Sequence, residues 1–172
     1  ETEVERSVEG RGSRHVVWVD SVGVLGAEVQ LADSVWLDKT EIQLIAERGA
    51  SVVHCPVTNM YLASGIAPIR ALLDHGVNVA LATDGAGSNN RQDMFETCKT
   101  TALLQKVGRH DAMALQPEEV LTMACRCGAQ LLTQPEELGP VHPSWRADLG
   151  VVVDRKIYML GKVVDLRGCP YM

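Results

Sequence analysis

The sequence predicts an α/β fold in which helices cover parallel strands, and the spacing of apolar residues is the main reason. Residues 50–56 (ASVVHCP) and 77–84 (VNVALATD) are apolar at nearly every position, which is typical of strands buried on both faces. Segments with the apolar spacing of helices follow them, at residues 65–76 and 92–108. This alternation favours a parallel sheet. It fits part of an open doubly wound sheet or part of a closed barrel, and periodicity does not separate the two.

One more strand and helix precede these units. The alternation of residues 28–37 (EVQLADSVWL) and their β-branched content predict a strand. Residues 38–49 predict a helix, because Asp38 or Thr40 can accept hydrogen bonds at its start and Gly49 can end it. The chain would therefore contain three successive strand–helix units.

The end of the chain changes character. Residues 117–133 predict a last helix. Residues 147–154 and 156–166 then predict two strands around a turn, with no helix between them. We therefore expect an α/β domain over residues 1–140 and a small antiparallel β appendage over residues 141–172.

Composition and charge restrict the class of protein. Hydrophobic residues make up 46% of the chain and charged residues 22%, which is typical of a globular protein. The formal net charge of −6, without a run of basic residues, disfavours a nucleic-acid partner. No apolar stretch predicts a membrane span, and no signal peptide is recognised. The five scattered cysteines predict reduced thiols in a cytoplasmic protein, and Glu1 in place of Met indicates a processed, truncated or partial chain.

Polar residues at the ends of the predicted strands are candidates for chemistry. Asp33, His54 and Asp84 each end or interrupt an apolar run. The carboxyl ends of parallel strands form the active-site face of α/β folds. Asp84 could bind a cation, accept a proton or cap the next helix, and its position before a Gly suits a turn equally well. A lone histidine such as His54 is more often a buried residue with satisfied hydrogen bonds than a ligand.

Two other patterns do not predict a site. Cys125 and Cys127 are two residues apart within a predicted helix, so they face different sides and lack the spacing of a zinc or redox pair. Residues 84–90 (DGAGSNN) lack the glycine spacing of a dinucleotide fingerprint or a P-loop. A nucleotide-binding doubly wound domain is therefore disfavoured.

Residues 54–106 carry a specific series of motifs. The series begins with HCPVTN, continues through a helix, and reaches a strand that ends in TDG before a loop rich in Ser and Asn. It resembles the amidohydrolase superfamily, in the branch of metal-dependent deaminases and chlorohydrolases of guanine, methylthioadenosine/adenosylhomocysteine and triazines. The resemblance implies a (β/α)8 TIM barrel with a small β-sandwich. This chain would supply the last three strand–helix units of the barrel and the C-terminal piece of the sandwich.

The resemblance also implies an activity and its residues. The enzyme would be a metal-dependent hydrolase of C–N bonds other than peptide bonds, most simply a deaminase of an N-heterocycle such as a purine, pterin or triazine. The metal would be zinc, or iron as in some relatives, with Asp84 as ligand and proton acceptor and Glu1 as the acid that protonates the ring. The residues expected to line the site are Asp33, His54, Asn59, Ser88 and Asn89.

The chain departs from the family pattern. In LADSVWLD, Asp33 stands where a family segment of the form LAHCVWLD has a histidine, which in the family helps to orient the hydroxide. The family's metal-binding histidines are absent from this sequence. Asp84 alone is fewer ligands than a catalytic zinc needs, so we expect the isolated chain to bind metal weakly and to be inactive. Two interpretations remain: part of an enzyme, which could form a homo-oligomer, or a non-catalytic relic or half-barrel that needs another chain.

Overall fold

The computed structural model describes residues 2–132, 136–139, 143 and 146. The strands are β1 (Gln30–Ala32), β2 (Ser51–His54) and β3 (Val79–Leu81). The helices are α1 (Thr2–Arg11), α2 (His15–Ser21), α3 (Lys39–Arg48), α4 (Pro56–Tyr61), α5 (Ile69–Asp74), α6 (Ala86–Asn89), α7 (Met94–Arg109), α8 (Pro117–Ala124) and α9 (Arg126–Leu131).

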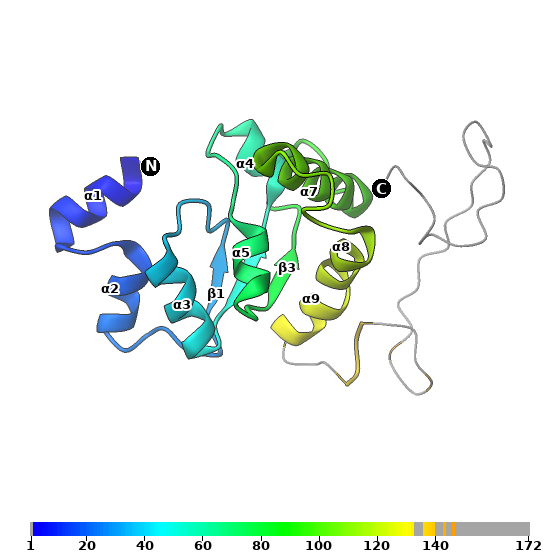
Figure 1. The fold of residues 1–172 in the computed structure, drawn as a ribbon. Helices are drawn as coiled ribbons and strands as arrows, with labels where there is room; N and C mark the ends of the chain where they lie inside the picture. The colour runs from blue at the N-terminus through cyan, green and yellow to red at the C-terminus, as the bar shows by residue number, and fades with distance from the viewer. Residues whose placement is uncertain (1, 133–135, 140–142, 144–145, 147–172) are drawn as a thin grey trace.

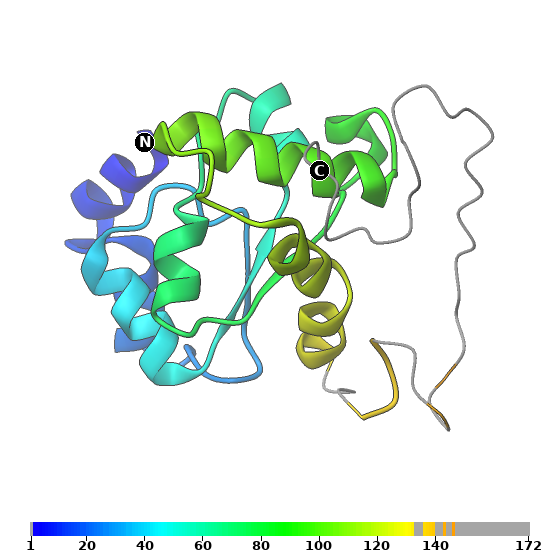
Figure 2. The same cartoon turned by 45° about the vertical axis from the view of Figure 1, so that its right-hand side comes forward.

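The strands form one parallel sheet in the order β1-β2-β3 (Figure 1). The strand arrows point toward the end of the sheet where α4 and α7 lie, and α1 and α2 lie together beyond the β1 side (Figures 1 and 2). On the opposite side, α8 and α9 contact each other and β3. The predicted α/β class and the parallel pairing of the strands are thus confirmed.

Local sequence signals explain the best-predicted helix, α3. The Asp38 side chain accepts a hydrogen bond from the Glu41 amide at 2.9 Å, and the Glu41 side chain accepts one from the Asp38 amide at 3.2 Å. This reciprocal capping box satisfies two amides that have no partner inside the helix. Gly49 ends α3 with a φ of 70°, a left-handed conformation that glycine adopts without a steric penalty. Asp38, not Thr40, is the cap.

The first strand is shorter than its alternating sequence predicts. A strand was expected over residues 28–37, but β1 ends at Ala32. Asp33 and Ser34 have φ values of 60° and 49°, which lie in the left-handed region. Two consecutive residues in that region turn the chain out of the strand, so residues 33–37 form a loop at the carboxyl end of the sheet.

Two helices also differ from their predictions. The helix expected over residues 65–76 begins only at Ile69, because Pro68 disfavours helical backbone at the residue before it. The helix expected over residues 117–133 is interrupted at Cys125, which separates α8 from α9. The overall order of strands and helices is unaffected by either change.

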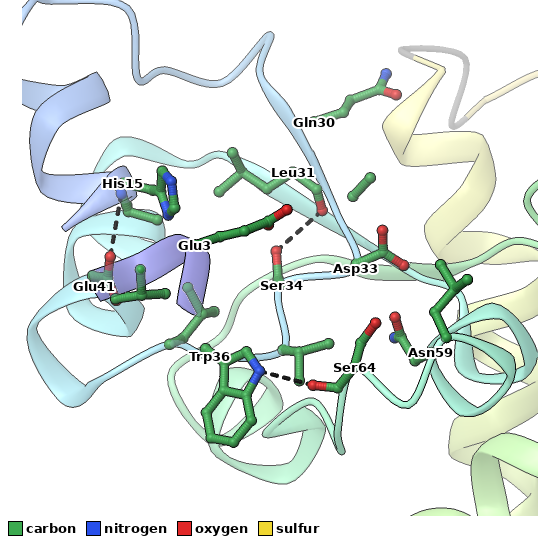
Figure 3. A pocket seen from close by; sticks show the side chains of 16 residues that line it. Glu3, His15, Gln30, Leu31, Asp33, Ser34, Trp36, Glu41, Asn59 and Ser64 are labelled. Carbon is green, nitrogen blue, oxygen red and sulfur yellow. Dashed lines mark hydrogen bonds between the residues drawn. The ribbon is translucent and has the colours of Figure 1, made fainter. Parts of the chain in front are cut away.

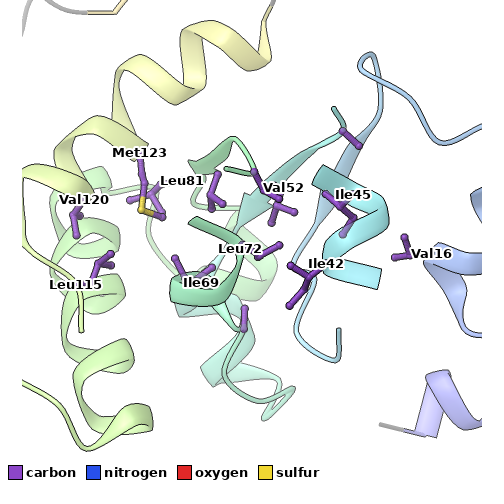
Figure 4. Close-up of a cluster of buried hydrophobic side chains, with 14 of the residues drawn as sticks. Val16, Ile42, Ile45, Val52, Ile69, Leu72, Leu81, Leu115, Val120 and Met123 are labelled. Carbon is purple, nitrogen blue, oxygen red and sulfur yellow. The ribbon is translucent and has the colours of Figure 1, made fainter. Parts of the chain in front are cut away.

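The main hydrophobic core lies between the sheet and the helices that follow its strands. Ile45 of α3, Val52 of β2, Leu72 of α5 and Met123 of α8, which Figure 4 labels, are 1% exposed or less. Val79 of β3 is equally buried. Burying one such side chain contributes about 1.5–3 kcal/mol. The core fixes the strands and leaves their carboxyl ends free to carry polar residues.

The predicted appendage lies almost entirely outside the described residues, as do its two expected strands and Glu1. The domain boundary after residue 140 therefore stays a prediction. Within the part of the chain that the structure describes, no helix combines the length and the apolar content that a membrane span requires.

Candidate active site

Three predicted site residues follow the three strands at one end of the sheet. Asp33 comes directly after β1, His54 is the last residue of β2, and Asp84 lies shortly after β3. Asp33 and Asp84 both have left-handed backbone, with φ values of 60° and 58°. A non-glycine residue in this conformation costs of the order of 1–3 kcal/mol, and such residues cluster at functional sites. The end of the sheet is therefore the candidate active site.

Hydrogen bonds from its own loop hold the Asp84 carboxylate. Oδ1 accepts from the Gly85 amide at 2.6 Å, and Oδ2 accepts from the Ser88 hydroxyl at 2.9 Å. These two bonds lower the pKa of Asp84 from its ordinary value, the Gly85 amide having the larger effect. Asp84 thus acts as the predicted turn residue. Because its carboxylate is also exposed and ionised, it still presents lone pairs to a cation or a proton.

The loop around Asp84 is itself fixed by the remaining predicted residues. Ser88 accepts a hydrogen bond from the buried Thr58 hydroxyl at 3.3 Å, which links the loop to α4. Asn89 is 4% exposed, and its Nδ2 donates to the carbonyl oxygen of Thr83. Asn89 therefore supports the loop from within, whereas Ser88 contacts the Asp84 carboxylate directly.

Asp33 has a different environment. Burial raises the pKa of its carboxyl group, and the negative charge of Asp84 raises it further. Its Oδ1 is buried without a hydrogen-bond partner among the described residues. The Asp33 amide donates to the Val53 carbonyl at 2.9 Å, which extends the pairing of β1 with β2 and fixes the position of the residue. Asp33 thus contributes a second carboxyl group, which is less readily ionised than Asp84.

Cys55 lies beside both carboxyl groups, and sequence reasoning assigned it no role. Burial raises the pKa of its thiol to about 12, and the charges of Asp33 and Asp84 add to the effect. The thiol is therefore protonated near pH 7, and it is a weak nucleophile in this environment. Its position directly after the strand-terminal His54 was the available sequence signal.

His54 is buried, as expected, but its hydrogen bonds are not satisfied. The side chain is 0% exposed, and neither Nδ1 nor Nε2 has a partner among the residues that the structure describes. Burial lowers the pKa of His54 to about 4, so the ring is neutral near pH 7. The expectation of a satisfied buried histidine was therefore only half right.

A pocket of about 470 Å³ opens beside β1 (Figure 3). Asp33 and Asn59 line it, and their polar ends are grouped with Ser64 on one side. Its walls also include Glu3 and His15. Asp84, Ser88, Asn89 and His54 are not among the lining residues. The structure thus divides the predicted residues between this pocket, the Asp84 loop and the buried end of β2.

The described residues do not complete a metal site. No group of three or more His, Cys, Asp or Glu side chains among them could hold a metal ion. The end of the sheet supplies the carboxylates of Asp33 and Asp84, whereas a catalytic zinc normally has three protein ligands. A resident zinc would therefore need ligands from beyond the described part of the chain.

The Amidohydrolase family pattern matches residues 1–166. A 5'-deoxyadenosine deaminase of Methanothermobacter thermautotrophicus is 43% identical over 159 residues, which are 92% of this chain and 37% of that protein. A 5-methylthioadenosine/S-adenosylhomocysteine deaminase of Haloquadratum walsbyi is 45% identical over 153 residues, which are 89% of this chain and 34% of that protein. The chain thus spans about a third of the length of these relatives.

Solved structures give the same result. The zinc-bound adenosine deaminase from Xanthomonas campestris has a TM-score of 0.78 and 40% identity, over 80% of this chain and 31% of that one. The zinc complex of atrazine chlorohydrolase from Arthrobacter aurescens has a TM-score of 0.74 and 28% identity, over 79% of this chain and 30% of that one. The resemblance first recognised in the HCP and TDG motifs is confirmed, and the chain belongs to the amidohydrolase family.

Proposed function

We propose that the protein carrying this chain is a metal-dependent hydrolase that removes the amino group from an adenosine-like N-heterocycle. The names of three of the proteins quoted above support the reaction, because they are deaminases of adenosine or of its derivatives. The observation that carries the proposal is the pair of left-handed aspartates, Asp33 and Asp84, at the carboxyl end of a parallel sheet. The substrate would be a small molecule, and we expect the protein to form a homo-oligomer.

The finer architecture belongs to the same proposal. The units β1–α3, β2–α5 and β3–α7 would be the last three units of a (β/α)8 barrel, and residues 141–172 would be a piece of a small β-sandwich. The parallel order β1-β2-β3 supports the barrel, since sequential parallel neighbours are what a barrel requires. The cysteines within the described ranges are free thiols, which suits the expected cytoplasmic location.

The roles of the carboxyl groups follow from their environments. A bound zinc or iron ion would supply a hydroxide at neutral pH by lowering the pKa of its water to about 7. Asp84 would hold this ion, and, as an ionised and exposed carboxylate, it suits the acceptance of a proton. Glu1, known here only from the sequence, would protonate the ring nitrogen. Two carboxyl groups would thus act as base and acid.

Two observations favour the alternative, a half-barrel without catalysis. Asp33 replaces an expected histidine, and the residues described by the structure do not form a complete metal site. A carboxylate next to Asp84 adds like-charge repulsion where the family pattern has a neutral imidazole. The experiment must therefore include a result that would support a chain without catalytic activity.

A chimera separates the two functions. Residues 1–172 would replace the matching segment of the Methanothermobacter relative, and hydrolysis of 5'-deoxyadenosine and zinc content would be measured. We expect turnover with bound zinc, and Asp84→Asn should reduce kcat by roughly 10²–10⁴-fold. Asp74→Asn, an exposed aspartate on α5, is the matched control and should have no effect. A folded, zinc-loaded chimera without turnover would support the relic instead.

A further inference from the structure

Trp36 lines the pocket next to Asp33 and is immobilised although it is 46% exposed. Its indole Nε1 donates to the carbonyl oxygen of Ser64 at 2.8 Å (Figure 3). Its own carbonyl oxygen accepts a hydrogen bond from the Arg14 guanidinium. The tryptophan is thus fixed both at its backbone and at the edge of its ring.

Arg14 is itself held firmly. Its Nε lies 2.8 Å from Oε2 of Glu41, which is 2% exposed, and 2.9 Å from Oδ2 of Asp38. Both carboxylates belong to the capping box of α3. Ion pairs with a buried partner are screened less by water and salt than exposed ones, so their attraction is stronger. The backbone of Trp36 is therefore anchored to the start of a core helix.

Gly65 lets the ring lie against the chain. A Cβ at this position would meet Trp36 Cζ2 at 3.3 Å and Val35 Cγ1 at 3.0 Å. Its φ of 120° also excludes most other residues. The indole thus packs against a backbone segment that only glycine provides. A ring held in this way loses little conformational freedom when a ligand stacks on it.

Asn59 supplies an independent observation in the same pocket. The side chain is 1% exposed, and its Nδ2 has no hydrogen-bond partner among the described residues. A buried donor without a partner is unfavourable. An acceptor atom on a bound ligand would satisfy it. Figure 3 shows its amide on the same side of the pocket as Ser64, which receives the Trp36 indole hydrogen bond.

We propose that Trp36 and Asn59 recognise the flat ring of a heteroaromatic ligand. The ring stacks on the exposed part of the indole, and a ring nitrogen or carbonyl oxygen accepts a hydrogen bond from Asn59 Nδ2. A purine has both features. This inference rests on the proposed function in its choice of ligand, and it adds the residues that would select a planar heterocycle over a non-planar one.

The test uses binding and needs no catalysis. In the 172-residue chain with Trp18→Phe and Trp145→Phe, Trp36 is the only indole, and adenosine should quench its fluorescence with saturation. Ribose, which lacks the flat ring, should not. By equilibrium dialysis of the otherwise unchanged chain, Trp36→Ala should weaken adenosine binding roughly tenfold or more, whereas Trp36→Phe retains most of it. Absence of saturable quenching, or equal binding by both variants, would overturn the proposal.

Further variants separate recognition from folding and from catalysis. Asn59→Leu has a similar size, removes the donor and places no charge in the buried position, so adenosine binding should fall while the thermal transition is retained. Phe95→Ala removes a ring that is 69% exposed on α7 and should leave binding unchanged. In the chimera, Trp36→Ala should raise KM more than it lowers kcat. A catalytically inactive chimera, together with saturable quenching of Trp36 by adenosine in the 172-residue chain, would reject the proposed function but not this inference.

Discussion

Asp33 and Asp84 follow non-adjacent strands of the sheet, yet the charge of Asp84 raises the pKa of Asp33. The two carboxyl groups differ in what surrounds them. Asp84 accepts hydrogen bonds from Gly85 and Ser88, which favour its ionised form. Asp33 is half-buried and has an unpaired oxygen, which favours its neutral form. Environments that separate two pKa values in this way are characteristic of acid–base sites.

The first prediction tests this coupling. In Asp84→Asn the negative charge is removed, so the pKa of Asp33 should fall but remain above its ordinary value, because burial is the larger cause. A carboxyl-carbon NMR titration of the two proteins measures the change. Asp74→Asn serves as the control, since it removes an exposed carboxylate from α5. A complete return of Asp33 to its ordinary pKa would show that the charge of Asp84, and not burial, causes the shift.

The second prediction concerns His54 and pH. Its pKa is about 4 in the folded protein and about 6.5 in an unfolded chain, so between these values the unfolded state binds a proton that the folded state does not. The stability that His54 contributes is complete above about pH 6.5 and is lost as the pH falls toward 4. Urea unfolding should therefore give a free energy about 2 kcal/mol lower at pH 5 than at pH 7 from this residue.

A variant isolates the contribution of His54 from those of other titrating groups. His54→Leu removes the proton site and also removes two buried nitrogens that lack partners. Its pH dependence of stability should be flatter by the same amount. His75→Gln changes an exposed histidine and controls for the removal of one histidine from the sequence. Identical slopes for the wild type and His54→Leu would mean that the ring is accessible to protons in the folded state.

Local signals in the sequence were sufficient for the central elements of the fold. Asp38 begins α3 and Gly49 ends it, as capping rules predict. The apolar runs of β2 and β3 reflect burial from both sides. The early end of β1 was not predictable in this way. Nothing in the alternation of residues 28–37 indicates left-handed backbone at Asp33, which depends on contacts with β2.

The site was predictable only as far as it follows the strand ends. The order of motifs located Asp33 and Asp84, because Asp33 comes directly after β1 and Asp84 shortly after β3. The pocket beside β1 was missed, since its tryptophan is fixed by Ser64, 28 residues away, and by Arg14, 22 residues away. Such contacts between distant segments have no periodicity that a single sequence can show.

The third prediction concerns Glu41, the buried member of the Arg14 network. Glu41 is 2% exposed and accepts hydrogen bonds from Arg14 at 2.8 Å and from the Val16 amide at 3.2 Å. Glu41→Ala leaves the guanidinium and an amide without this partner, so the free energy of unfolding should fall by about 2–4 kcal/mol, allowing for partial exposure of Arg14. Chemical denaturation provides the measurement.

An exposed ion pair gives the matched comparison. Asp74 accepts from Arg70 at 2.8 Å, but its side chain is 58% exposed. Asp74→Ala should cost less than about 1 kcal/mol, as exposed ion pairs do. If both substitutions lowered stability equally, burial of Glu41 would not be what gives the Arg14 network its strength.

The fourth prediction decides what Asp33 does in the reaction. In the chimera, Asp33→His removes a carboxylate near Asp84 and supplies an imidazole that can donate a hydrogen bond to developing negative charge. Since a single such donor is worth roughly 10²–10³-fold in rate, kcat for 5'-deoxyadenosine should rise at least about tenfold.

Asp33→Asn separates the two effects, because it removes the charge without adding an imidazole. If kcat rises with both variants, repulsion between Asp33 and Asp84 limits the rate in the unchanged chain. If kcat rises with histidine alone, the missing hydrogen-bond donor limits it. A fall with both would mean that the Asp33 carboxyl group itself serves the reaction, and the relic interpretation would then have no support from this position.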